Sequence, residues 1–194
     1  NQNCLQYICP TLTTYELLMK KLLCLPVFVV LLTIFSTSNV LGQKENDDSL
    51  SVVIPTTIEA NLDMIVAPDV FEISKAFKGY ISIPNSSAIM MTLIQDVNFL
   101  KIDEGMTPEF YAQNQLNFIS KSDFISDKGV KGKYYKLSFE LKGDKFIRYM
   151  VYAGDLKQTL WLNVTYPQSL ETLLEEEILK CFQTINLNPT SDEK

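Results

Sequence analysis

The chain has 194 residues, no histidine, a formal net charge of −6 at neutral pH and a single arginine, Arg148. Without histidine it cannot form Ser-His-Asp or Cys-His triads, and nearly all catalytic zinc and non-haem iron sites are excluded. An acidic chain with one arginine also does not fit nucleic-acid binding, which depends on Lys and Arg neutralising phosphates.

The N-terminal part of the chain is typical of a secretory signal peptide. We interpret residues 1–18 as an extension upstream of a translation start at Met19. A lysine pair, the apolar run 22–35 and a small-residue cleavage site ending at Gly42 then predict a signal peptide over 19–42. An uncleaved anchor is the alternative, but it needs roughly 20 consecutive apolar residues. We therefore expect export to the bacterial periplasm or beyond, with no stable membrane anchor after cleavage.

Cysteine placement supports a domain without disulfides. Cys4, Cys9 and Cys24 precede the cleavage site, so only Cys181 remains in the exported part. It falls among apolar residues at helical spacing, which favours a buried small hydrophobe over a reactive thiol. The exported domain must draw its stability from its core, and this suits a bacterial envelope or secreted protein.

The rest of the chain has the length and composition of one domain. Residues 43–50 are polar, charged and without periodicity, so we expect a linker there. A single α+β domain is predicted over 51–187, followed by a disordered polar tail over 188–194.

The first half of this domain contains short strand patterns and one helix start. Residues 51–58 are weakly strand-like, and 80–83 and 88–95 are predicted strands joined by a turn-rich tetrad. Thr107 is followed by Pro and Glu, a combination that caps and opens a helix. We expect this helix to continue to about Ile119.

A three-strand antiparallel meander is predicted from Lys133 to Tyr166. Its first strand alternates apolar and polar residues, and a two-residue Gly143-Asp144 loop joins it to the second. That loop would place Leu141 opposite Phe146. Because the second strand is apolar on both sides, we expect cover on both faces of the sheet.

The last predicted element is a helix after Pro167. Apolar residues recur there at three-and-four spacing from Leu170 to Ile185. Acidic residues near its start and Lys180 near its end agree with the helix dipole, and Glu176 with Lys180 makes an i, i+4 pair.

The order of these segments resembles the PsbP-like family. The resemblance is carried by residues 66–71 (VAPDVF), 77–80 (FKGY), 105–109 (GMTPE), 149–155 (YMVYAGD) and 165–167 (TYP). It implies an α/β/α sandwich, with a central antiparallel sheet and helices on both faces. Family members with known roles bind other proteins, and the bacterial relatives it suggests are exported or soluble domains without an assigned activity. No site residue is carried over.

Carboxylates are the only acid–base groups left for catalysis. Residues 175–177 are three consecutive glutamates, but consecutive helical positions fan around the axis, which favours a solvated face over a metal or acid–base cluster. Asp103-Glu104 lacks the spaced pattern of a calcium loop. We therefore predict no catalytic residue, no metal site and no cofactor.

Arg148 is the one charge placed among apolar neighbours. Either it stacks on Tyr135 or Tyr152 and reaches a carboxylate, or it binds a ligand at an open sheet face. For the function of the chain, our hypothesis is a noncatalytic accessory or protein-interaction module. We expect a monomer or weak oligomer with an unknown protein partner. The alternative is a small-ligand binder or carboxylate-based hydrolase with a cleft near Arg148.

Overall fold

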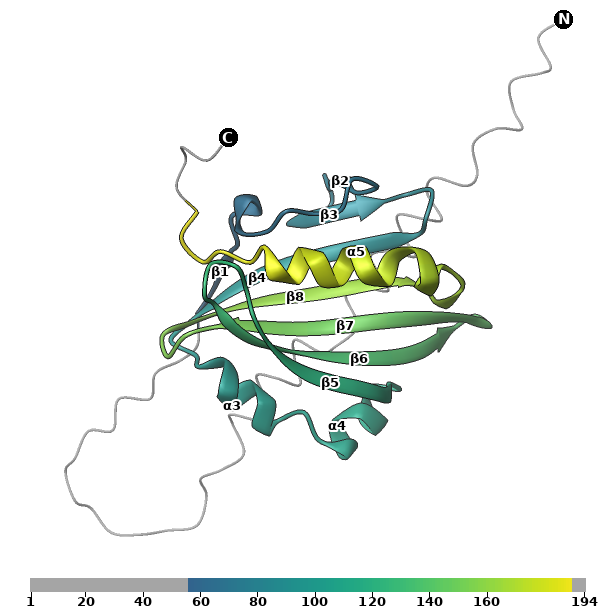
Figure 1. Ribbon diagram of the computed structural model, residues 1–194. Helices are drawn as coiled ribbons and strands as arrows, with labels where there is room; N and C mark the ends of the chain where they lie inside the picture. The colour runs from purple at the N-terminus through teal and green to yellow at the C-terminus, as the bar shows by residue number, and fades with distance from the viewer. Residues whose placement is uncertain (1–55, 190–194) are drawn as a thin grey trace, which may run out of the picture. The chain divides into compact units, whose positions relative to one another are not determined.

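The structure, a computed structural model, describes residues 56–189. Its central feature is an antiparallel sheet of eight strands with helices against it (Figure 1). The proposed extension 1–18, signal peptide 19–42 and linker 43–50 lie outside the described residues, as does most of the tail 188–194. These assignments stay predictions.

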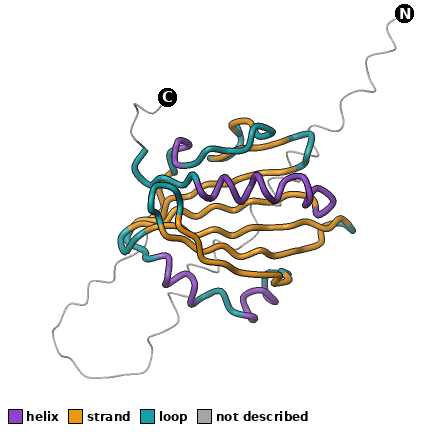
Figure 2. Tube along the Cα trace, viewed as in Figure 1, coloured by secondary structure: helices purple, strands orange, loops and turns teal. Residues whose placement is uncertain are grey.

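The sheet order is β2-β3-β4-β8-β7-β6-β5, and β1 also pairs with β4 (Figure 2). Every paired strand runs antiparallel to its neighbour. In chain order the elements are β1 (Thr56–Glu59), η1 (Leu62–Met64), β2 (Glu72–Ile73), β3 (Gly79–Ser82), β4 (Ser87–Gln95), α3 (Phe99–Glu104), α4 (Pro108–Gln113), β5 (Asn117–Ile125), β6 (Lys131–Leu141), β7 (Asp144–Gly154), β8 (Gln158–Pro167), η2 (Gln168–Leu170) and α5 (Glu171–Gln183).

Two helical layers cover opposite faces of the long strands. On the α5 face, the side chains of Tyr149 and Val151 share one buried cluster with Ile178 and Phe182 of α5. On the other side, the α3 face, Tyr135 and Tyr152 contact residues of α3 and of the α3–α4 connection. The predicted fold class, an antiparallel sheet with helices on both faces, is confirmed. The apolar character of β7 on both sides is explained by this double cover.

The hairpin between β6 and β7 differs from the prediction by its turn. Leu141 pairs with Asp144, so the two loop residues are Lys142 and Gly143, both with positive φ, at 56° and 92°. The expected Gly143-Asp144 loop, with Leu141 opposite Phe146, is therefore wrong. The register moves by two residues, and because side chains alternate with a period of two, each still lies on its predicted face.

The helix predicted from Thr107 to Ile119 begins where expected and ends early. The Thr107 side chain caps α4 by accepting from the Phe110 N–H at 3.3 Å. The helix ends at Gln113, where Asn114 donates back to a backbone carbonyl and Gln115 takes a positive φ of 55°. Ile119 belongs to β5, a strand missing from the prediction. The other predicted elements, β3, β4, β8 and α5, are confirmed.

Candidate functional site

Arg148 lies inside the molecule. It is 4% exposed on the α3 face of β7, and its guanidinium carbon lies 4.5 Å from the centre of the Phe139 ring. Its Nε donates to Thr165 Oγ1 at 3.4 Å. Burial lowers the pKa of Arg148 to about 10, so the group remains charged at neutral pH. The expected aromatic partner was Tyr135 or Tyr152, whereas the ring beneath the guanidinium is that of Phe139.

The two tyrosines of the hypothetical cleft are also buried. Tyr135 and Tyr152 are each 1% exposed and meet edge to face, with ring centres 6.3 Å apart. Tyr152 stacks on Trp161 from β8, and its hydroxyl lies 4.0 Å from the sulfur of Met106. The hydroxyls of both tyrosines contact residues of α3 and of the α3–α4 connection, so the two rings do not line an open cleft.

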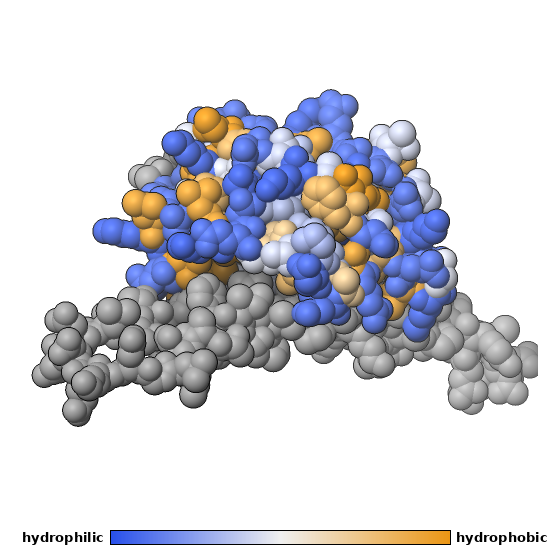
Figure 3. Space-filling model, turned by 90° about the horizontal axis from the view of Figure 1, so that it is seen from below, coloured by the Kyte–Doolittle hydropathy of each residue, from blue (hydrophilic) through white to orange (hydrophobic). Residues whose placement is uncertain are grey.

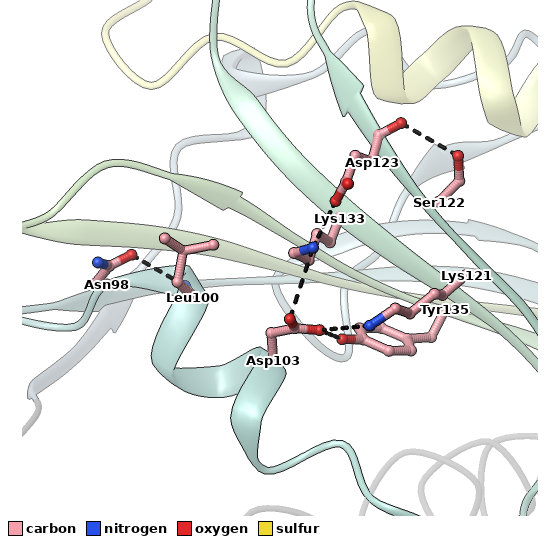
Figure 4. A network of polar contacts seen from close by, with 8 residues as sticks. All are labelled: Asn98, Leu100, Asp103, Lys121, Ser122, Asp123, Lys133 and Tyr135. Carbon is pink, nitrogen blue, oxygen red and sulfur yellow. Dashed lines mark hydrogen bonds and ion pairs between the residues drawn. The ribbon is translucent and has the colours of Figure 1, made fainter.

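Asp103 is the centre of a charged network that fastens α3 to the sheet (Figure 4). Its Oδ1 accepts from the hydroxyl of Tyr135 on β6 and from Lys121 Nζ on β5 at 3.3 Å. Lys133 Nζ lies 3.6 Å from its Oδ2 and 2.6 Å from Asp123 Oδ1. These five residues, two acids, two lysines and a tyrosine, are called the Asp103 network below.

The electrostatics of this network suit a structural role. Partial burial acts to raise the pKa of Asp103, but hydrogen bonds from Tyr135 and Lys121 and the charge of Lys133 outweigh it, so the pKa is lowered. Burial and the hydrogen bond to Asp103 raise the pKa of Tyr135. The carboxylate stays ionised and fully engaged, which makes it a poor general acid or base at neutral pH.

A second network holds α5 to the α5 face. Lys136 of β6 pairs with Glu171 at 2.5 Å and with Glu175, which also accepts from the Tyr149 hydroxyl at 2.6 Å. Partial burial acts to raise the pKa of Glu175, but Lys136 and Tyr149 outweigh it and lower the value. We call Lys136, Tyr149, Glu171 and Glu175 the Glu175 network.

The three consecutive glutamates of α5 therefore separate. Glu176 and Glu177 lie on the exposed side, where each is 2.9 Å from Lys180, as the solvated-face interpretation predicted. Glu175 turns inward, against that interpretation. Lys136 could have revealed this from the sequence. It lies on the same face of β6 as Tyr134, the face that packs against α5, and a lysine covered in this way needs an acidic partner.

Metal and membrane candidates are not found over residues 56–189. No group of three or more Cys, Asp or Glu side chains in this range is placed to hold a metal ion. None of the helices in this range has the length and hydropathy needed to span a bilayer. Cys181 is 3% exposed in the core, and burial raises the pKa of its thiol to about 12.

The outer side of β5, which we call the β5 edge, is an exposed feature with binding potential. β5 ends the sheet order, and within residues 56–189 no strand pairs with its outer side. All of its residues except Phe124 are exposed, including Phe118 (49%), Ile119 (45%) and Ile125 (61%). A bulge interrupts its pairing with β6 between Phe118 and Ser120. Seen from the side of α3 and α4, the surface mixes apolar and hydrophilic side chains (Figure 3).

No protein-family model and no curated protein sequence matches the chain. Solved structures do match. LpqN of Mycobacterium tuberculosis, a protein involved in cell envelope biogenesis, superposes with a TM-score of 0.51 at 14% identity, over 73% of this chain and 88% of LpqN. The chain shares its fold with LpqN.

Two further structures overlap less well. CyanoP, the PsbP protein of the cyanobacterium Synechocystis, matches with a TM-score of 0.49 and 5% identity, over 74% of this chain and 98% of CyanoP. PA94 of Pseudomonas aeruginosa, a protein of unknown function, matches with a TM-score of 0.41 and 11% identity, over 74% of this chain and 89% of PA94. At these sequence identities the likeness concerns the fold alone and identifies no functional residue in this chain.

Proposed function

We propose that this chain is a noncatalytic, extracytoplasmic accessory domain that binds a polypeptide partner at the β5 edge. The proposal rests on one observation: the β5 edge is exposed, whereas the ionisable groups considered for a site are paired within the chain or buried. Asp103 and Glu175 are committed to networks that join helices to the sheet, and Arg148 is buried. The β5 edge instead exposes backbone groups and apolar side chains to solvent.

The chemistry of an edge strand supports this use. Every second residue of an edge strand directs its backbone N–H and C=O outward, where an added strand can pair with them. Proteins that recognise extended segments by strand addition use such edges, and neighbouring apolar side chains supply further affinity. Phe118, Ile119 and Ile125 are in position to do so.

Two observations support the extracytoplasmic location. The sequence predicts a signal peptide at residues 19–42, and the fold is shared with an envelope-biogenesis protein, LpqN. The location we propose is the bacterial periplasm or the exterior, with an accessory role in an envelope process.

A capture experiment tests the binding surface. The purified protein is immobilised and exposed to the extracytoplasmic fraction of its source cells, beside the variants Ile125→Lys and Leu173→Lys. Both replaced residues are exposed and apolar, at 61% and 72%, but Leu173 lies on α5, away from the edge. We expect a partner that wild type and Leu173→Lys retain and Ile125→Lys loses. Equal retention by all three proteins contradicts the proposal, as does turnover of a substrate by the purified protein.

A further inference from the structure

Symmetry restricts how two copies of β5 could pair. A two-fold axis perpendicular to the sheet joins two edge strands in antiparallel orientation and keeps every side chain on its own face. A residue can then meet only residues of the same face, which lie an even number of positions away. The possible registers are therefore few, and each is centred on one residue of β5 that faces itself.

Charge selects one of these registers. When the pair is centred on Ser122, Lys121 of each copy faces Asp123 of the other, which makes two opposite-charge pairs. Centring on Lys121 would oppose two lysines, and centring on Asp123 would oppose two aspartates. Within the single chain Lys121 pairs with Asp103, and Asp123 pairs with Lys133. The side chains of Lys121 and Asp123 are nevertheless 52% and 76% exposed, so each has a solvent-facing side that a second copy can contact.

Apolar side chains agree with the same register. Centring on Ser122 brings Ile119 of one copy next to Ile125 of the other, at both ends of the paired segment. These residues are 45% and 61% exposed in the single chain. Pairing would remove part of this apolar area from water at each end.

We propose that the β5 edge pairs with the β5 edge of a second copy of this chain, antiparallel and centred on Ser122, so that two sheets join into one. This inference rests on the proposed function, because it names the partner taken up at the same edge. The paired segment is short, so the dimer is weak and depends on protein concentration.

Charge variants test the register. Lys121→Glu places an acid opposite Asp123, and Asp123→Lys places a base opposite Lys121, so sedimentation equilibrium should show dimerisation weakened roughly tenfold for each variant alone. Mixing the two variants restores both opposite-charge pairs in a heterodimer. The mixture should therefore associate about as strongly as wild type, which misfolded variants could not do.

Cysteine substitution locates the symmetry axis. In a background with Cys4, Cys9 and Cys24 changed to Ser and the buried Cys181 retained, Ser122→Cys faces its own copy and should form a disulfide-linked dimer on mild oxidation. Ser120→Cys is the matched control: it is an exposed serine of the same strand that faces Phe124 of the partner in this register. It should cross-link much more slowly.

Two results would overturn the inference. One is a protein that stays monomeric up to millimolar concentration. The other is a dimer in which Ser120→Cys cross-links as fast as Ser122→Cys, or in which mixing the charge variants restores nothing. A monomeric protein whose Ile125→Lys variant still loses a captured envelope protein would leave the proposed function standing and reject only self-pairing.

Discussion

The Tyr149 hydroxyl donates a hydrogen bond to Glu175 Oε1 at 2.6 Å, and so links a central strand of the sheet to the helix that covers it. Lys136 pairs with the same oxygen. A hydrogen bond to a charged group contributes about 1.5–3 kcal/mol. We expect Tyr149→Phe to lower the free energy of unfolding, measured in urea, by about 1.5 kcal/mol, the lower end, because Glu175 is partly exposed.

Tyr134→Phe is the matched control for this change. The Tyr134 ring packs edge to face on Tyr149, with centres 5.7 Å apart, and both rings contact Phe182. Within residues 56–189 its hydroxyl has no hydrogen-bond partner, so its removal should alter the free energy of unfolding by less than about 0.5 kcal/mol. Equal losses from the two variants would mean that the Glu175 network does not stabilise the fold.

Acid should weaken the fold through Asp103 and Glu175. Both carboxyls have lowered pKa values in the folded chain. In the unfolded chain the pKa of Asp is about 3.9 and that of Glu about 4.3. The unfolded state therefore takes up protons first as the pH falls, and stability rises with pH in this window. Their contribution is complete above about pH 5 and is lost as the pH falls through the folded pKa values.

Asp103→Asn and Glu175→Gln should each flatten this dependence. Neither variant has the carboxylate that the folded state favours, so each is less stable than wild type at neutral pH and approaches wild type as the pH falls. Urea unfolding between about pH 3 and pH 7 measures the difference. Wild-type and variant curves that stay parallel across this range would show that the two carboxyls do not cause the acid dependence.

The sequence predicts those parts of the fold that depend on local patterning. Alternation in β6 and the three-and-four spacing of α5 reflect burial of one face, and the structure follows both. β5 escapes prediction because an edge strand exposed on most of its length needs no alternation, and Phe118 and Ile119 fitted the extension of α4 equally well.

The two charged networks could not be predicted for a different reason. Alternation places Lys136 on a face of β6, but it does not say which acid of α5 will lie above it, because that depends on how the helix is rotated and shifted on the sheet. Likewise the sequence places Asp103-Glu104 in a loop before a helix, whereas the structure places both residues at the end of α3. The ion pair of Asp103 with Lys121 depends on β5, a strand that the sequence does not reveal.

Arg148 should behave as a packed core residue. Arg148→Ala removes a buried side chain between Phe139 and Thr165, and we expect a loss of about 2–5 kcal/mol in the free energy of unfolding, as for other large-to-Ala core changes. Arg148→Met keeps most of the volume without a buried charge, so it should be clearly more stable than Arg148→Ala. Thermal unfolding of both variants measures this. If the two were equally stable, packing would not explain the burial of Arg148.

The turn between β6 and β7 offers a test of its conformation. Lys142 and Gly143 both take positive φ, as in a type I′ hairpin, where Asn-Gly is the preferred sequence. Lysine lacks the tolerance of Asn for this region, so Lys142→Asn should raise the free energy of unfolding by about 0.5–1 kcal/mol. Gly143→Ala should lower it by about 1 kcal/mol, since its φ of 92° disfavours a side chain. If the loop were instead Gly143-Asp144, Lys142 would be an ordinary strand residue and Asn there would destabilise the hairpin, because Asn has low strand propensity.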